Sequence, residues 1–323
     1  MAVLEFEDVH VTYQSGSGPV PAVRGVSLAV EPGSSLGLAG ESGSGKTSLT
    51  ASVLRLLPKS ATVSGRVLLD GEDVLTMRWG RLRAVRWAVA SVVFQGAMHG
   101  LNPVQRIGQQ IAEPIRLHEK SVSEPTARAR VGDLLEQVGL PSRVAQSYPH
   151  QLSGGQKQRV MIAMALACGP RLIVADEPTT ALDVMVQQQV LDVLAERVRD
   201  LGLAMIFISH DLSVLASACE NLAVMYAGQV VELGPSDAVL NQAHHPYSRA
   251  LGEAYPRIGD QRFRYAPSGL PGDPPFPGEA PDGCPFHPRC PQAQDVCGTT
   301  DVALRPSGDR RWSSCLFAPE VGA

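Results

Sequence analysis

A glycine-rich segment at residues 40–47 constrains the fold more than any other part of the sequence. Its sequence, GESGSGKT, fits the pattern G-x-x-x-x-G-K-[ST] at every position. A short apolar run, Ser35–Ala39, precedes it and predicts a buried strand, and a helix is predicted from Lys46 to about Leu57, where Pro58 stops it. Such a loop presents backbone N–H groups and a helix N-terminus to phosphate groups. The segment therefore predicts a nucleotide-phosphate site, and a chance Gly/Ser turn is the alternative.

The residue types of this segment predict how the phosphates are bound. The glycines allow the backbone to wrap around the β-phosphate with its N–H groups. Lys46 is placed to reach the β- and γ-phosphate oxygens, and the Thr47 hydroxyl is placed to bind Mg²⁺. The predicted nucleotide contacts of this segment are Gly40, Ser42, Gly43, Ser44, Gly45, Lys46, Thr47 and Ser48.

Two adjacent acidic residues follow a second apolar run. The run Leu172–Ala175 predicts a buried strand, and Asp176 and Glu177 come at its carboxyl end. In a nucleotide hydrolase, Asp176 would hold Mg²⁺ through water and Glu177 would polarise the attacking water. Two acids after a strand can also be an exposed strand end, but their combination with the phosphate loop favours the catalytic interpretation.

The other apolar patterns predict an α/β core. The N-terminal segment alternates apolar and polar side chains, which predicts antiparallel strands with one buried face. Apolar runs at residues 172–175 and 205–209, joined by a predicted helix at Val186–Asp200, indicate a mostly parallel sheet. Between about residues 96 and 160 the spacing is helical. Beyond about Gly259 the chain is rich in Pro and Gly, which predicts a linker or small irregular module and not a continuation of the core.

Composition and charge exclude several classes of function. Of the 323 residues, 44% are hydrophobic and 19% are charged, which is ordinary for a globular chain with a core. The net charge of −4 offers no basic surface to DNA or RNA. The first residues show no basic stretch followed by an apolar run, so we expect no secretory signal, and no apolar segment reaches the roughly 18 residues of a membrane span. We therefore expect a cytosolic chain without a nucleic-acid partner, and any membrane part would belong to another chain.

A second glycine-rich helix start lies at residues 152–156, with the sequence LSGGQ. Its serine and glycines open a helix predicted at Gln156–Ala167, which is a second helix N-terminus suited to phosphate. It has no Lys-Thr pair and no preceding buried strand, so it is not a second copy of the first loop. This motif resembles the signature of the ABC ATPases. Together with the first loop and the acidic pair, it makes the chain similar to that family over about residues 3–240.

The resemblance implies that each ATP lies between two ATPase subunits, because the signature helix of one caps the γ-phosphate bound to the other. Tyr13 matches the aromatic residue that stacks on adenine, and Gln95 matches the glutamine that senses Mg²⁺ and contacts the membrane partner. Asp183 matches the loop that crosses the dimer interface. His210 matches the histidine that grips the γ-phosphate, and it joins Glu177 as a catalytic residue.

The resemblance therefore extends the predicted site. The nucleotide contacts that it adds are Tyr13, Gln95, Ser153, Gly154, Gly155, Gln156 and Asp183. The implied Mg²⁺ ligands are Thr47, Gln95 and Asp176.

Four of the six cysteines lie in the last 40 residues, at Cys284, Cys290, Cys297 and Cys315. Disulfides are disfavoured in a reducing cytosol. Zinc can be bound by four thiolates, although its structural sites usually have closer cysteine pairs. An iron–sulfur cluster also needs four thiolates and tolerates varied spacing. The tail is similar to that of oligopeptide, dipeptide and nickel importer ATPases, of which some bind a 4Fe–4S cluster here, so this resemblance implies a cluster, with Zn²⁺ as the alternative.

The combined prediction is an α/β chain with a P-loop core of ABC type, an antiparallel β subdomain, a helical subdomain at about 96–160 and a small Cys-rich extension. The ATPase domain is predicted at 1–258 and the extension at 259–323. The resemblance implies an ATPase subunit at the cytoplasmic side of the membrane, powering import of di- or oligopeptides. Its implied partners are a second ATPase subunit, two transmembrane permeases and an extracellular solute-binding protein. A nickel or metal-chelate importer is the nearest alternative, and a soluble ABC ATPase outside transport is the more distant one.

Overall fold

The computed structural model describes residues 1–16, 18–94, 100–178, 184–254, 270, 272–276 and 278–319. The chain forms two compact units, each built from several segments. The first unit consists of Met1–Leu4, Val30–Ser34 and Leu68–Ile206. The second unit consists of Glu5–Ala29, Ser35–Val67 and Phe207–Ala323. Strand β8 (Ala204–Ile208) is fully buried and continues from the first unit into the second.

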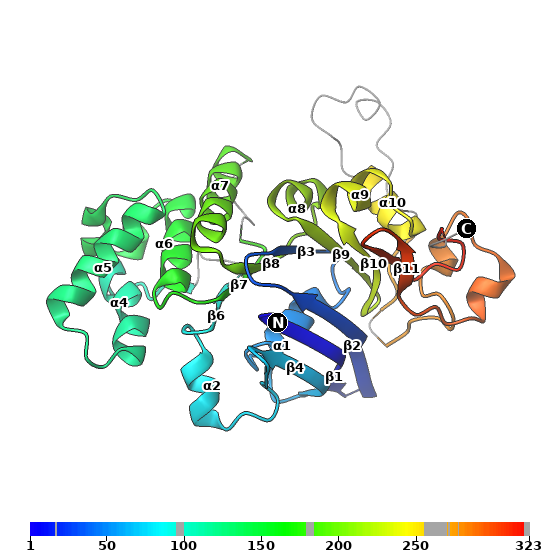
Figure 1. Cartoon of the computed structure of the whole chain (residues 1–323), viewed down its shortest axis with the longest axis horizontal. Coiled ribbons are helices and arrows are strands. Elements are labelled where there is room, and N and C mark those ends of the chain that lie inside the picture. The colour runs from blue at the N-terminus through cyan, green and yellow to red at the C-terminus, as the bar shows by residue number, and fades with distance from the viewer. Residues whose placement is uncertain are drawn as a thin grey trace. The chain divides into compact units, whose positions relative to one another are not determined.

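The first unit contains a group of packed helices. Helices α4 (Ile107–His118), α5 (Glu124–Gln137) and α6 (Gly154–Leu166) contact one another, and α6 also contacts α7 (Val184–Leu201) (Figure 1). Two short 3₁₀ turns, at Ser142–Gln146 and Pro149–Gln151, connect α5 to α6. The helical pattern predicted for this part of the sequence is confirmed.

Local sequence explains where α5 begins and ends. The Ser123 hydroxyl accepts a hydrogen bond from the Thr126 N–H at 3.3 Å and caps the first turn. At the other end Gly139 has a φ of 69°, and the Leu140 N–H reaches back to the Leu135 carbonyl. A left-handed glycine just beyond the last turn is the usual way in which a helix stops.

The strands of the first unit run in parallel where the sequence predicts a parallel sheet. Strand β6 (Ala90–Val93) pairs with β7 (Leu172–Asp176), with Ala90 opposite Leu172 and Val93 opposite Ala175. Every residue of β7 is buried, which fits its unbroken apolar run. The unit also holds helix α2 (Trp79–Val85) and the short strand β5 (Glu72–Asp73), which pairs with the end of β4 (Ala61–Leu69).

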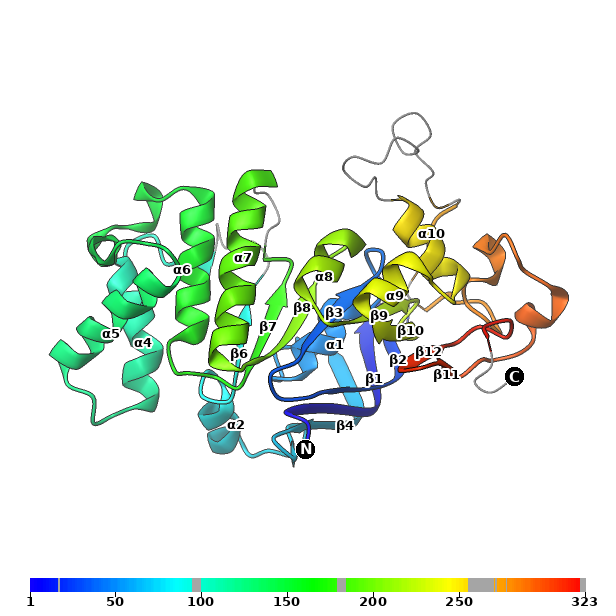
Figure 2. The same ribbon diagram turned by 45° about the horizontal axis from the view of Figure 1, so that its top comes forward.

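The second unit contains a sheet whose strands follow the order β11-β12-β10-β9-β3. Strand β3 (Ser35–Ala39) is parallel to β9 (Asn221–Tyr226), and β9 is antiparallel to β10 (Gln229–Pro235). Helices α8, α9 and α10 lie along one face of these strands (Figures 1 and 2). They span Leu212–Ala218, Ser236–Asn241 and Pro246–Ala254.

The Cys-rich tail joins this sheet, which corrects the expectation that it would not continue the core. Strand β12 (Arg311–Ser313) pairs antiparallel with β10, and β11 (Arg305–Gly308) pairs with β12. The Arg311 guanidinium donates to the Glu232 carboxylate of β10 at 2.9 Å, and Glu232 is fully buried. The tail strands are short and lack an alternating apolar pattern, so the sequence gives no strand signal there.

Strands β1 (Leu4–Ser15), β2 (Gly18–Val30) and β4 (Ala61–Leu69) lie in a second sheet, in the order β2-β1-β4. Their buried positions alternate with more exposed ones, and the buried side chains include Phe6, Val9 and Val11. The alternation predicted for the N-terminal segment is therefore confirmed. None of the helices in the described ranges combines the length and apolar character that crossing a bilayer requires.

Helix α1 is shorter than predicted, since it spans Lys46–Ser52 and does not continue to Leu57. The Thr50 hydroxyl donates to the Lys46 carbonyl at 3.1 Å, and the Ser52 hydroxyl donates to the Leu49 carbonyl at 2.5 Å. Beyond them Arg55 has a φ of 50°, and the Leu56 N–H donates to the Ala51 carbonyl at 2.9 Å, so a left-handed residue closes the helix.

Gly37 in β3 allows α8 and β9 to pack closely against this strand. A Cβ atom at this position would clash with Leu222 Cδ2 and would lie 3.2 Å from Leu215 Cβ. Both neighbours are fully buried, so neither has free space into which it could move.

We therefore expect Gly37→Ala to lower the free energy of unfolding by about 1–3 kcal/mol, because it overfills a packed core. Gly80→Ala is the matched control, since Gly80 lies in helix α2 with no atom within 4 Å of the added Cβ. The control should be neutral or stabilising by up to about 1 kcal/mol. Urea unfolding of both variants measures the difference, and equal stability of the two would refute the packing argument.

Candidate functional site

The phosphate loop takes a conformation that only glycine allows at two positions. Gly40 has a φ of 144° and Gly45 a φ of 100°. A Cβ atom on Gly40 would clash with the Met225 carbonyl oxygen, and one on Gly45 would clash with the Ala22 carbonyl oxygen. The loop therefore follows the neighbouring backbone too closely for any side chain at these positions.

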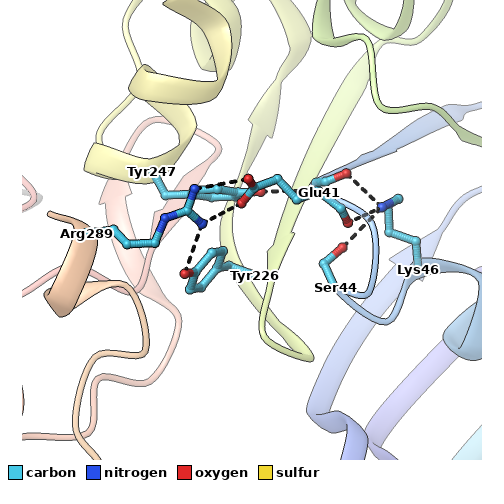
Figure 3. Close-up of polar contacts among 7 residues, drawn as sticks. Glu41, Ser44, Lys46, Tyr226, Tyr247 and Arg289 are labelled. Carbon is cyan, nitrogen blue, oxygen red and sulfur yellow. Dashed lines mark hydrogen bonds and ion pairs between the residues drawn. The ribbon is translucent and has the colours of Figure 1, made fainter. Parts of the chain in front are cut away.

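The Lys46 ammonium group lies inside the loop that it closes. Its Nζ donates to the carbonyl oxygens of Gly40 at 2.7 Å and Glu41 at 2.8 Å, and to Ser44 Oγ at 3.2 Å (Figure 3). Lys46 is 7% exposed, whereas the neighbouring Thr47 is exposed. The loop thus concentrates one buried positive charge beside an accessible hydroxyl group.

The structure brings Tyr13 of β1 to helix α1. The Tyr13 hydroxyl lies 3.0 Å from the Ser48 hydroxyl, so two residues predicted to contact the nucleotide are hydrogen-bonded partners. Of the other loop residues, Ser42 and Gly43 are exposed and Ser44 is buried.

The acidic pair ends strand β7 in the first unit. Asp176 is the last residue of the strand and is 8% exposed, and Glu177 follows it at intermediate exposure. Glu177 has a φ of 42°, which lies in the left-handed region that residues other than glycine rarely adopt. A strained backbone of this kind is common at functional sites.

The LSGGQ segment forms a capped helix start, also in the first unit. Ser153 Oγ accepts from the Gln156 N–H at 3.3 Å, and the Gln156 side chain accepts from the Ser153 N–H at 3.0 Å. This reciprocal pair is a capping box. A Cβ atom on Gly155 would clash with Val186 Cγ1 of α7, so this position is sterically restricted to glycine.

The remaining predicted residues are distributed as follows. His210 is exposed and comes between β8 and α8, directly before Asp211, which caps α8 through hydrogen bonds from the Ser213 and Val214 N–H groups. Gln95 and Asp183 lie outside the described residues.

The four cysteines of the tail line one small cavity of about 20 Å³, together with Phe286 and His287. Burial raises the pKa of the thiols of Cys284, Cys290 and Cys315, and the neighbouring cysteines of the cavity raise it further. All six cysteines of the chain are free thiols. Within the described ranges, no group of three or more His, Cys, Asp or Glu side chains has the arrangement that holds a metal ion.

A polar network that no sequence motif predicts connects the phosphate loop to the tail. The Arg289 guanidinium donates to both carboxylate oxygens of Glu41, at 2.7 and 3.1 Å, and to the Tyr226 hydroxyl at 3.2 Å. Glu41 stands at a variable position of the loop pattern, and Arg289 follows no recognisable motif. Only the folded chain reveals this pair, because 248 positions separate the two residues.

Comparison with known proteins defines the class to which this site belongs. The family model "ABC transporter" matches residues 23–180, and the model "Oligopeptide/dipeptide transporter, C-terminal region" matches residues 231–297. The dipeptide transport ATP-binding protein DppD of Escherichia coli strain K12 is 41% identical over 320 residues, which cover 98% of this chain and 97% of the relative. The oligopeptide transport ATP-binding protein OppD of Salmonella typhimurium is 40% identical over 297 residues, covering 91% of this chain and 88% of the relative.

Solved structures agree with this assignment. A dimeric ATP-binding cassette bound to ADP and phosphate in a post-hydrolysis state is 28% identical, with a TM-score of 0.65, and the match covers 72% of this chain and 98% of that one. The cbiO1 protein of Clostridium perfringens, part of an ABC transporter complex, is also 28% identical, with a TM-score of 0.63 over 75% of this chain and 91% of that one. The fold and the site define an ATPase of the ATP-binding cassette class. Within that class, the chain belongs to the family of ABC transporter ATPases that carry the oligopeptide/dipeptide transporter C-terminal region.

Proposed function

We propose that this chain binds MgATP at residues 40–48 and hydrolyses it. The observation that carries the proposal is the placement of Lys46, whose buried ammonium group is held by the loop's own carbonyl oxygens next to the exposed Thr47. In this proposal Lys46 and the loop N–H groups bind the β- and γ-phosphates, and Thr47 binds Mg²⁺. Tyr13, held beside Ser48, stacks on the adenine ring.

The acidic pair and His210 supply the hydrolytic chemistry in this proposal. Asp176 and Gln95 complete the binding of Mg²⁺, and Glu177 polarises the attacking water. The rare φ of Glu177 supports a functional role for its carboxylate. His210 contacts the γ-phosphate, and its exposure leaves it accessible to a ligand.

The LSGGQ segment and Asp183 act in a dimer in this proposal. Residues 153–156 bind the γ-phosphate of an ATP held by a second ATPase subunit, and Asp183 lies at the interface. The capping box supports this role, because it fixes the N-terminus of α6, a helix of 13 residues. The existence of a dimeric ATP-binding cassette among similar structures supports it as well.

We further propose that the subunit powers import of di- or oligopeptides. The support is the function of the relatives, which are dipeptide and oligopeptide transport ATP-binding proteins and match this chain over 98% and 91% of its length. The proposed partners are a second ATPase subunit, two transmembrane permeases and an extracellular solute-binding protein, with this chain at the cytoplasmic side of the membrane. The division into an ATPase domain at 1–258 and an extension at 259–323 remains a prediction.

Glu177→Gln should lower ATP hydrolysis by at least about 100-fold while ATP binding survives, because it removes the carboxylate that activates water and keeps the side chain's shape. Phosphate release measures hydrolysis, and calorimetric titration with MgATP measures binding. The matched control is Glu196→Gln on helix α7, an exposed glutamate that belongs to none of the predicted site motifs. Hydrolysis at the original rate in Glu177→Gln would show that another group is the catalytic carboxylate.

The cargo proposal predicts which solute stimulates the assembled transporter. In proteoliposomes that contain the permeases and the ATPase pair, the solute-binding protein loaded with di- or oligopeptides should raise the ATPase rate severalfold and drive peptide uptake. The same preparation loaded with a nickel chelate should give only the basal rate. Stimulation by the nickel chelate without a response to peptides would assign the chain to metal import.

We also propose that Cys284, Cys290, Cys297 and Cys315 bind a 4Fe–4S cluster, with Zn²⁺ as the alternative. The fit rests on the convergence of all four thiols on one cavity, which matches the four thiolates that such a cluster requires. Against zinc stands the spacing of the four cysteines, which is wider than that of the close cysteine pairs usual in structural zinc sites. A bound cluster would supply cross-links for a module with little apolar core, and its thiols would have to lose their protons on binding.

Anaerobic purification with the partner chains should give a broad absorption at the blue edge of the visible range, with iron and sulfide in near-equal amounts. Cys290→Ser should lose the absorption and most of the iron, since one ligand is removed. Cys168→Ser is the control and should retain both, because Cys168 lies outside the cavity. Zinc alone, or no metal, in the unaltered protein would overturn the cluster.

A further inference from the structure

Every polar group of Glu41, the second residue of the phosphate loop, has a partner. Its carbonyl oxygen accepts from Lys46 Nζ at 2.8 Å, and its N–H donates to the Tyr247 hydroxyl at 2.9 Å. Its carboxylate accepts two hydrogen bonds from Arg289 (Figure 3). One residue therefore connects the phosphate-binding lysine to groups that lie outside the loop.

The partners of Glu41 hold it with a well-defined geometry. The two bonds from Arg289 are bidentate, which fixes the plane of the carboxylate as well as its position. The side chains of Arg289 and Glu41 are only 6% and 22% exposed, so solvent screens this pair little. Tyr247 is fully buried in α10, which makes its hydroxyl a rigid acceptor for the loop N–H.

Aromatic rings hold the guanidinium of Arg289 in place. It lies 5.8 Å from the ring centroid of Tyr226 and 5.9 Å from that of Phe286, within cation–π range. Tyr226, Tyr247 and Phe286 pack against one another with centroids 4.6 to 5.3 Å apart. Phe286 and Arg289 belong to the Cys-rich tail, so the tail contributes both the charge and part of its packing.

The charge of the Glu41 carboxylate matters for phosphate binding, because this carboxylate lies in the phosphate loop. A carboxylate in the loop would repel the triphosphate that the loop is proposed to bind, and the repulsion would be strong at low solvent exposure. Arg289 cancels that charge and also fixes the backbone whose carbonyl groups hold Lys46. An arginine that only anchored the tail would need no partner in the phosphate loop.

We propose that Arg289 is a positioning residue for ATP binding, which acts through Glu41 by neutralising its carboxylate and fixing the phosphate loop. The inference rests on the proposed role of residues 40–48 as the ATP site. It makes the Cys-rich tail a direct determinant of nucleotide affinity. Because Arg289 directly precedes Cys290, the conformation of the cysteine module sets the position of the guanidinium.

The test compares the affinity of four variants for the magnesium complex of a non-hydrolysable ATP analogue, AMP-PNP, by calorimetry. The full chain is used in complex with its partner chains. Arg289→Met should weaken binding about tenfold, because it leaves the Glu41 carboxylate half-buried and uncompensated. Glu41→Gln should bind within about threefold of the unaltered protein, because no charge is left to repel phosphate. The double variant should recover most of the loss seen with Arg289→Met alone.

Arg311→Met is the matched control for loss of a tail arginine. Arg311 also joins the tail to a core carboxylate, that of Glu232, and its side chain is 9% exposed, but it does not contact the loop. Its affinity for the analogue should stay within about twofold of the unaltered protein.

Three outcomes would overturn the inference: unchanged affinity in Arg289→Met, a double variant as weak as Arg289→Met, or an equal loss in Arg311→Met. Thermal unfolding identifies any variant that fails to fold. If Arg289→Met fails, Arg289→Lys replaces it, and this variant should bind about threefold more weakly because it keeps the charge and loses the bidentate geometry. Unaltered affinity in Lys46→Ala would instead refute the proposed ATP site, so the two failures are distinguishable.

Discussion

The close fit of the phosphate loop to the backbone around it is the constraint on which the second unit depends. Gly40 packs against the carbonyl group of Met225 on β9, and Gly45 packs against that of Ala22 on β2. Neither position has room for a Cβ atom. The turn between β9 and β10 completes the contact, because the Gly228 N–H donates to the Ser44 carbonyl at 3.1 Å. The loop is thus fixed by strands that are distant in the sequence, before any ligand binds.

That fit explains why the sequence predicts this part of the molecule so well. The motif requires glycines at fixed spacing, and the apolar strand before it and the helix after it follow from short-range patterns. The same holds for the buried strand β7 and for α5, whose serine cap and terminal glycine are both visible in the sequence. The end of α1 was not predictable in the same way, because the left-handed residue that closes it is Arg55 and not a glycine.

The features that the sequence does not predict depend on contacts between segments that lie far apart in the chain. The tail has too few apolar residues to signal a strand, yet β12 pairs with β10, where Arg311 reaches the buried carboxylate of Glu232. The Glu41–Arg289 pair is equally invisible in the sequence, since neither residue stands at a position that a motif defines. A charged pair across 248 positions leaves no periodicity, so pattern analysis misses it however strong it is.

The two tail arginines differ in what their carboxylate partners do. Glu232 is fully buried and also accepts hydrogen bonds from the N–H groups of His244 and His245, so both of its carboxylate oxygens have partners within the fold. Glu41 is more exposed and stands in the loop that holds Lys46. A buried pair of the first kind adds little net stability over apolar residues but is costly to break. A pair of the second kind can change what the loop binds, because loss of Arg289 would leave the uncompensated charge of Glu41 to repel an anion that enters the loop. The two pairs have the same chemistry and different consequences. Arg311–Glu232 holds the tail against β10, whereas Arg289–Glu41 neutralises a carboxylate of the phosphate loop.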